Sequence, residues 1–382
     1  MSLPSRLRAL SSDLKLFWAV VFCLMYGFGV YSATFFNFVT EVIRIRPEQL
    51  GVLEAVRETP GFLCVIVTAI TMRIAEPLLG SVALFLVAVG MGAYATVHGV
   101  PGLIVWSFIW SVGLHTWMPL SSSIVLTLAK EGDKGKRLGQ TSAVGSLGAT
   151  AGMMTVRIIG YSLPYPKWFL LGGGAVGVAF VLILRLRRDI GHAQKPRLVW
   201  KREYSLYYAL TFLEGCRKQV FFTFAPFALT KVYKTPLETM ALLMVINNVV
   251  NFVGSPIAGR WVDRIGERRI LITSYTALAL VFLGYASIPV ALALCVLYCL
   301  DNLFYLSTIC LTTYLQKIAE PADLMPSLSL GVSLNHTAAV VVPLVGGYLW
   351  AAFSYPVTFY GGTFVVLISL YLASQVRSKR VV

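Results

Sequence analysis

Residues 259–269 read Gly259-Arg260-Trp261-Val262-Asp263-Arg264-Ile265-Gly266-Glu267-Arg268-Arg269. This charged stretch separates two apolar segments, residues 237–260 and 269–288, whose lengths suit helices that cross a lipid bilayer. A short turn with basic residues between two such segments is typical of a connection that stays at the membrane surface. The stretch therefore predicts a pair of membrane helices, and the remaining chain is interpreted outward from it.

Composition extends this interpretation to the whole chain. Of 382 residues, 57% are hydrophobic and 13% are charged, and the mean hydropathy is +0.75, whereas a soluble domain carries about 25% charged residues. The long continuous apolar runs exclude the short alternating segments of a membrane β-barrel. We predict an all-α protein with twelve transmembrane helices: 16–40, 50–73, 78–97, 101–129, 138–160, 166–186, 204–231, 237–260, 269–288, 290–318, 326–352 and 355–375.

The basic residues are distributed unevenly along this predicted topology. The net charge is +15, which taken alone could suggest a nucleic-acid partner. With both termini in the cytoplasm, however, 23 lysines and arginines face the cytoplasm and six face outward, as the positive-inside rule requires. We therefore predict an integral protein of the bacterial inner membrane with cytoplasmic termini, in contact with membrane lipids and not with nucleic acid.

A long basic connector divides the predicted helices into two sets of six. It runs from Arg185 to Arg202 and contains Gly191 and Pro196. Each half carries a charged triple and a mid-segment histidine, although on different helices of the two sets. We expect an amino-terminal bundle (1–190), a cytoplasmic linker (191–203) and a carboxy-terminal bundle (204–382).

Seven charged side chains fall inside the predicted spans: Glu54, Arg57, Glu58, Glu214, Arg217, Lys218 and Asp301. Each costs roughly 2.5–3.5 kcal/mol at the centre of a spanning helix, so such residues normally face a protein interior or a water-filled path. Glu54 lies about one turn from a helix end, where water could reach it. Asp301, Glu58 and Glu214 are candidates for reversible protonation, whereas Arg57, Arg217 and Lys218 are candidates for binding an anionic group.

Further polar and aromatic residues could contribute to substrate binding: His115, His336, Asn335 and Trp117. The two histidines could instead join Asp301, Cys216 or Cys310 around a transition metal, but no ligand spacing supports this, and we predict neither a metal site nor a cofactor. The sequence contains no phosphate-binding glycine loop, HExxH motif or hydrolase elbow. An enzyme is therefore not expected.

The charged turn resembles the signature loop of the major facilitator superfamily, a Gly-x-x-x-Asp-Arg-x-Gly-x-Arg-Arg pattern between the eighth and ninth helices. The matching residues are Gly259, Asp263, Arg264, Gly266, Arg268 and Arg269. The resemblance implies two pseudo-symmetric six-helix bundles and a role for these residues in stabilising the outward-facing state. The corresponding first-half turn departs from the pattern, because Met72 replaces the acid and only Arg73 is kept.

Together these features predict a monomeric secondary transporter that moves a small anionic or zwitterionic solute by alternating access, coupled to protons. An alternative is an antiporter for amphiphilic drugs, with a cavity lined by Phe221, Phe222, Phe224, Trp110 and Trp117. Transport of a transition metal or its chelate, and a membrane receptor without transport, are further alternatives.

Overall fold

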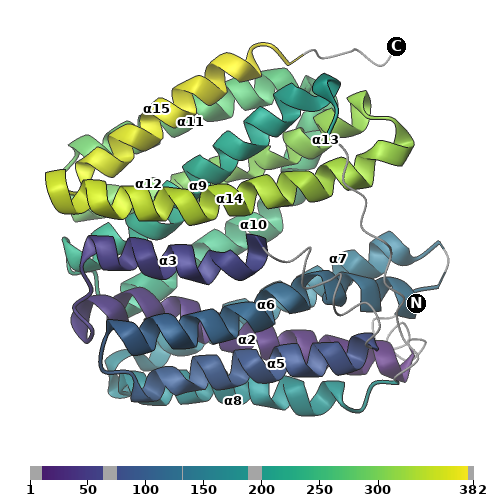
Figure 1. Cartoon of the computed structure of the whole chain (residues 1–382), viewed down its shortest axis with the longest axis vertical. Helices are drawn as coiled ribbons and strands as arrows, with labels where there is room; N and C mark the ends of the chain where they lie inside the picture. The colour runs from purple at the N-terminus through teal and green to yellow at the C-terminus, as the bar shows by residue number, and fades with distance from the viewer. Residues whose placement is uncertain (1–10, 63–74, 131, 188–199, 377–382) are drawn as a thin grey trace. The chain divides into compact units, whose positions relative to one another are not determined.

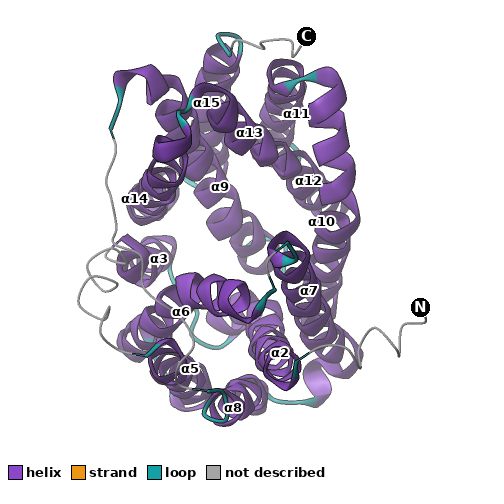
Figure 2. Cartoon of the chain, turned by 90° about the vertical axis from the view of Figure 1, so that its right-hand side faces the viewer, coloured by secondary structure: helices purple, strands orange, loops and turns teal. Residues whose placement is uncertain are grey.

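The computed structural model describes residues 11–62, 75–130, 132–187 and 200–376 (Figure 1). Within these ranges every regular element is a helix, and Figure 2 shows only helices and loops. The predicted all-α class is confirmed. Part of the predicted segment 50–73, including Arg73 of the first-half turn, lies outside the described residues, as do residues 191–199 of the predicted linker.

The helices begin and end close to the predicted positions. They are α2 (Ser12–Glu41), α3 (Pro47–Phe62), α5 (Glu76–Gly92), α6 (Val100–Leu128), α7 (Lys134–Ile159), α8 (Tyr165–Ile183), α9 (Ser205–Lys231), α10 (Leu237–Ile265), α11 (Glu267–Ser287), α12 (Ala291–Tyr305), α13 (Ile309–Ile318), α14 (Pro321–Phe353) and α15 (Pro356–Ala373). A 3₁₀ turn joins α12 to α13, so these two helices make one span. Ten described segments are long and apolar enough to cross a bilayer; the charge-bearing α3 and α9 complete the predicted twelve.

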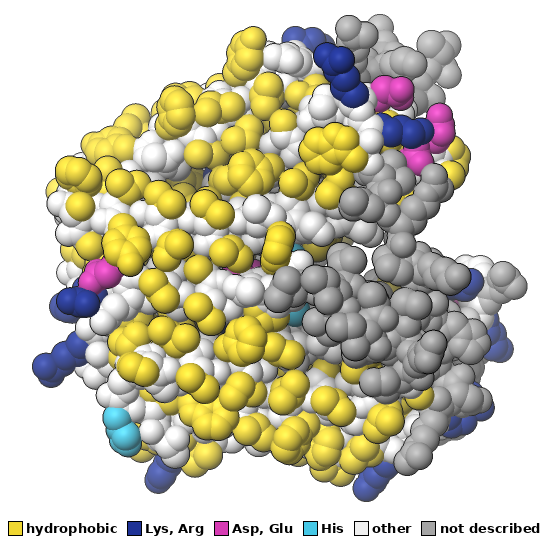
Figure 3. Space-filling model, viewed as in Figure 1, with side chains coloured by type: hydrophobic (Ala, Val, Ile, Leu, Met, Phe, Trp, Pro, Cys, Tyr) yellow, Lys and Arg dark blue, Asp and Glu magenta, His cyan; other side chains and the backbone are white. Residues whose placement is uncertain are grey.

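The outward faces of the helices are apolar. Exposed large side chains include Leu280, Leu292 and Phe364, each with about two thirds or more of its area accessible. On the face drawn in Figure 3, hydrophobic side chains cover the helices and the basic side chains lie near the helix ends. Apolar surface of this extent is typical of helices surrounded by lipid.

The chain forms two compact units. The first contains Met1–Phe38 and Leu63–Lys195, and the second contains Val39–Phe62 and Pro196–Val382. In the first unit, α5 packs on α6 and α8. Its interior is aromatic: the ring of Tyr31 contacts Tyr94, Trp110 and Phe169, and the indole of Trp110 donates to the Tyr94 hydroxyl at 3.2 Å.

The second unit contains α3 together with the helices from α9 to α15, and α3 packs lengthwise on α14. Glycines allow the two backbones to approach. A Cβ atom at Gly51 would clash with the carbonyl oxygen of Pro343, and one at Gly347 would lie 2.6 Å from the carbonyl oxygen of Pro47. This contact brings the charged side chains of α3 to a helix that is far away in the sequence.

A turn with the same backbone geometry follows α2 and α9. Arg44 and Lys234 both adopt the left-handed region, with φ of 56° and 53°. The next residue in each case donates its amide to a carbonyl six residues earlier, from Ile45 to Val39 and from Thr235 to Leu229, both at 2.9 Å. Two equal turns after the first helix of each predicted half agree with a duplicated architecture.

Candidate functional site

All seven charged side chains that the sequence places within spans lie in the second unit. They come from α3, α9 and α12, and α14 adds His336 and Asn335. Three are cationic and four are carboxylates. The packing of α3 on α14 and of α9 on α12 and α14 therefore gathers in one unit residues from the beginning, middle and end of the chain.

Arg217 is the centre of the most buried charged group. Its Nη1 atom donates to Asp301 Oδ1 at 2.9 Å, and its Nη2 atom donates to Glu214 Oε1 at 2.5 Å. The guanidinium and Asp301 are each 1% exposed, and Glu214 is 4% exposed. The ring of Tyr305 lies 5.3 Å from the guanidinium carbon, which adds a cation–π contact. One buried cation thus serves two carboxylates.

Lys218, the neighbouring cation, points to a different partner. Its Nζ atom donates to Asn335 Oδ1 of α14 at 3.0 Å. Arg217 is a partner of Asp301, but the structure does not pair Lys218 with Asp301. The reason is helical geometry, because consecutive residues are rotated by about 100° around an α-helix. The side chain of Lys218 therefore contacts α14, whereas that of Arg217 contacts α12.

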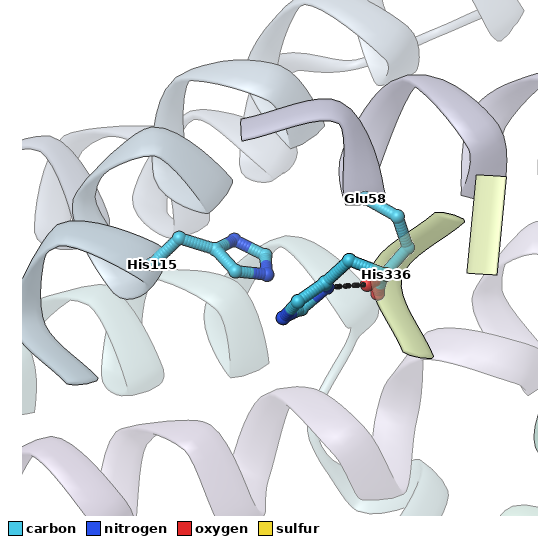
Figure 4. Close-up of side chains that lie close together, drawn as sticks. All are labelled: Glu58, His115 and His336. Atoms are coloured by element: carbon cyan, nitrogen blue, oxygen red, sulfur yellow. Dashed lines mark hydrogen bonds and ion pairs between the residues drawn. The ribbon is translucent and has the colours of Figure 1, made fainter. Parts of the chain in front are cut away.

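The charges of α3 form two further pairs. Arg57 forms an ion pair with Glu54, which is only 2% exposed. The expectation that Glu54 is reached by water is therefore wrong, since packing of α3 within the unit covers this turn. One turn further along, Glu58 Oε2 lies 3.1 Å from Nδ1 of His336 (Figure 4). This pair is half-buried, with side-chain exposures of 20% and 18%.

Two predicted substrate residues belong to the first unit. His115, also drawn in Figure 4, lies in α6, and its Nδ1 atom is 2.9 Å from both the hydroxyl and the carbonyl oxygen of Ser111. Trp117 is 4% exposed and stacks on Phe17 at 5.8 Å. Both therefore contribute to packing within their own helix bundle.

The residues proposed for a metal do not assemble around one in the second unit. Asp301 is bound to Arg217, and Cys216 and Cys310 are buried. Glu58 and His336 offer a carboxylate oxygen and an imidazole nitrogen, which transition metals accept as ligands.

The aromatic residues proposed for a drug cavity are mostly covered. Phe221 packs against Phe282 and Tyr285, and Phe224 packs against Trp350. Trp110, Trp117, Phe221 and Phe224 have exposures of 4% or less, whereas Phe222 is 45% exposed. Four of the five rings are thus core residues, and of these five only Phe222 has an exposed ring.

The signature turn has the expected backbone. α10 ends at Ile265, α11 begins at Glu267, and Gly266 between them has a φ of 87°, which favours glycine. Gly259 lies in the last part of α10 with open space beside its Cα atom. The charged residues named for this motif have exposed side chains: Asp263, Arg264, Arg268 and Arg269.

The buried acid of the turn is Glu267, which the sequence interpretation did not select. It is 1% exposed, and its carboxylate forms an ion pair with Lys317 of α13 at 2.7 Å. The sequence feature that could have identified Glu267 is its position in the first turn of a helix, where the helix dipole favours negative charge. A partner from α13 could not be read from the sequence, because it depends on how the helices pack.

A second polar contact joins the residues just before α9 to the first turn of α14. Asp323 accepts hydrogen bonds from Lys201 at 2.5 Å and from the Tyr204 hydroxyl at 3.2 Å. The hydrogen bond to Asp323 raises the pKa of Lys201 above its usual range. The end of the predicted linker is therefore attached to the start of α14.

Comparison with known proteins agrees with this architecture. Residues 207–380 match the sequence profile described as Major Facilitator Superfamily. This match covers the carboxy-terminal part of the chain, less than half of its length. No curated protein sequence matches it significantly.

The fold of the whole chain is similar to that of several transporters of known structure. A variant of the nucleoside transporter NupG has a TM-score of 0.83 at 12% identity, covering 96% of this chain and 100% of the other. The peptide transporter POT in complex with sulfate has a TM-score of 0.76 at 14% identity, covering 95% and 94%. A bacterial homolog of the human lysosomal transporter Spinster, inward-facing and unoccupied, has a TM-score of 0.72 at 12% identity, covering 98% of each chain.

The structural similarity over almost the whole chain confirms the predicted fold class. At 12–14% identity, the structural neighbours show the fold of this chain but do not show its substrate.

Proposed function

We propose that this protein is a secondary transporter that couples the movement of a small anionic or zwitterionic solute to protons by alternating access. The observation that carries the proposal is the position of Arg217 between Glu214 and Asp301. These three side chains are almost completely buried. With both carboxylates ionised, the group has a net charge of −1 in a place where water cannot solvate it.

A proton relieves this imbalance. Burying a charge is costly unless it is paired, and removal of one partner from a buried ion pair leaves an uncompensated charge. The seven charged side chains within the predicted spans, three cations and four carboxylates, have the same net charge of −1. One added proton makes the set neutral, and this supports a cycle in which the unit changes state with one proton bound.

The half-buried pair of Glu58 and His336 is suited to exchange that proton with water. Both side chains keep about a fifth of their area accessible, whereas Asp301 keeps 1%. Glu58 also acts electrostatically on Lys218. Protonation of Glu58 would therefore free Lys218 from a competing carboxylate, so that proton binding and anion binding strengthen each other.

The cations differ in their availability to a solute. Arg57 is paired with Glu54, and Arg217 is paired with two carboxylates. Among the named cations, Lys218 has a neutral amide as its hydrogen-bond partner. The solute's anionic group would first meet Lys218, and the two arginines would hold the surrounding helices in place.

The sequence prediction for orientation is retained as part of the proposal: a monomer in the bacterial inner membrane with both termini in the cytoplasm. Single cysteines at Lys134, Lys195, Lys234 and Arg380 test it in intact cells. A membrane-impermeant thiol reagent should label position 234 and leave the other three unlabelled. Labelling of position 195 from outside would contradict this orientation.

Transport is tested with purified protein in liposomes that contain a pH-sensitive dye. Carboxylates, amino acids and amines are added one class at a time, without an imposed gradient. We expect an anionic or zwitterionic solute to carry protons inward with it. Movement of amines against protons would instead indicate an antiporter, and solute uptake without any pH change would exclude proton coupling.

A further inference from the structure

Lys218, Asn335 and Phe222 form a small surface of mixed character on α9 and α14. The Lys218 ammonium is 3.0 Å from the side-chain oxygen Oδ1 of Asn335 and 5.8 Å from the centre of the Phe222 ring. Phe222 lies one helical turn after Lys218 on α9, is 45% exposed, and contacts the Tyr305 ring at 5.7 Å between centroids. A cation, an amide and an open aromatic face thus lie within the reach of one small molecule.

We infer that this surface binds an organic anion with a single carboxylate and an aromatic or other flat apolar body. The carboxylate would accept from the Lys218 ammonium and from the Asn335 amide, and the body would stack on Phe222. This inference rests on the proposed function and narrows its substrate class to monocarboxylates.

The charge of the ligand follows from the partners of Lys218. In the described part of the chain, no ion pair includes Lys218, and its hydrogen bond goes to a neutral amide. A lysine is a compact single charge, whereas phosphate groups are usually held by several donors or by a bidentate arginine. The single positive charge of Lys218 therefore balances a ligand with one negative charge, but it does not balance a phosphate ester with two.

A zwitterion fits the surface less well than a simple acid. Its ammonium group would need a carboxylate, but Glu214 and Asp301 already accept from Arg217. Glu58 already lies against His336. The polar groups next to Lys218 are therefore committed to one another, while the exposed neighbour is the Phe222 ring.

The open side of this surface is not suited to lipid. A lysine next to hydrocarbon is costly, and ionisable groups in membrane helices normally face a polar interior or water. His336 follows Asn335 directly on α14 and pairs with Glu58 of α3, so the polar region continues past the surface. An exposed phenylalanine beside these groups offers a stacking face for a solute that arrives through water.

Thermal unfolding of the purified protein in detergent tests the inference without requiring transport. The probes are benzoate, phenylacetate and cinnamate, each compared with its neutral amide, together with benzylamine. We expect the acids to raise the melting temperature in a concentration-dependent way and the amides and the amine to have little effect. Acetate should bind at least tenfold more weakly than the best aromatic acid.

Variants separate the contributions. Lys218→Gln should abolish the rise in melting temperature caused by the acids. Phe222→Ala should weaken the binding of aromatic acids to about the strength of acetate binding. Lys234→Asn is the matched control, because it also removes one lysine charge of the unit but at an exposed turn, and asparagine tolerates its positive φ. Lys218→Arg keeps the charge and should retain part of the binding if Lys218→Gln does not fold.

Two results would overturn the inference: no acid stabilises the wild-type protein more than its amide, or Lys218→Gln and Lys234→Asn respond to the acids alike. Preferential stabilisation by benzylamine would also overturn it, because the surface would then bind cations. Binding of acids in detergent combined with no proton movement in liposomes would count against the proposed function and leave this site standing.

Discussion

Arg217 and Asp301 are joined by a hydrogen bond of 2.9 Å between α9 and α12, in the interior of the second unit. Glu214 binds the same guanidinium from within α9. The link between the two helices therefore depends on a charge that one proton can remove. A contact of this kind can bias a conformational equilibrium, because an equilibrium moves only by differential stabilisation of its states.

Asp301→Asn should abolish solute accumulation driven by a pH gradient. Asparagine has nearly the same size and imitates the protonated acid, and Arg217 would keep Glu214 as its counter-ion. Binding of the solute and downhill exchange should remain. The measurement is uptake into liposomes with and without an imposed pH gradient, at equal protein amount.

Asp133→Asn is the control for this substitution, because Asp133 is a partly exposed acid that pairs with Arg137 near the start of α7. It should accumulate solute like the wild type. If Asp301→Asn also accumulates solute at the wild-type level, Asp301 is not the coupling residue, and Glu58 and Glu214 become the candidates.

Arg217→Met should be much more damaging to stability than Asp301→Asn. Methionine fills a similar volume but leaves Glu214 and Asp301 buried without a cation, and breaking a buried pair in this way costs about 3–5 kcal/mol. Thermal unfolding in detergent should show the lower melting temperature, with partial recovery at acidic pH as the two acids take up protons. Equal melting temperatures for the two variants would show that water already solvates this group.

The fold could be predicted from the sequence because its signal is local. Each apolar run fixes one helix, and the ends of α10 and α11 lie near the predicted limits because Gly266 interrupts a continuous pattern. The helices α12 and α13, predicted as one segment, are joined by a 3₁₀ turn and still form one span. Lipid exposure makes hydrophobicity itself the structural signal.

The site could be predicted only in part, because partners depend on packing. Glu214 and Arg217 are three residues apart, which places them on one face of a helix, and the structure contains an ion pair between them. The assignment of Lys218 to Asn335, and of Glu58 to His336, requires knowing that α3 and α9 both pack on α14. Helical spacing gives the direction of a side chain but not the helix that it meets.

At the signature turn, substitutions of the exposed and the buried acid should separate rate from stability. Asp263→Asn should slow the transport cycle and leave expression unchanged, since it removes an exposed charge that the resemblance assigns to one conformational state. Glu267→Gln should lower the melting temperature, because Lys317 would lose a carboxylate that is 1% exposed; hydrogen bonds to charged groups contribute about 1.5–3 kcal/mol. Uptake rates and thermal unfolding are measured on both variants, and an unchanged rate in Asp263→Asn would remove that residue from the switch.

Gly51→Ala should destabilise the protein through the contact between α3 and α14. An alanine Cβ would collide with the carbonyl oxygen of Pro343, which is part of a helix backbone and cannot rotate away. Overpacking of this kind typically costs about 1–3 kcal/mol. Because α3 carries Glu58 and α14 carries His336, the displacement should also separate that pair and weaken proton-coupled uptake.

Gly361→Ala in α15 is the matched control, because no atom lies within 4 Å of the position that its Cβ would take. Within a helix this change should be neutral or stabilise by about 0.4–1 kcal/mol, since alanine restricts the unfolded chain. Thermal unfolding and uptake are measured for both alanine variants. The expected order of melting temperatures places Gly51→Ala below the wild type and Gly361→Ala at or above it. If Gly51→Ala unfolds at the wild-type temperature and transports normally, α3 does not pack closely on α14 at this point, and the proximity of Glu58 to His336 loses its structural basis.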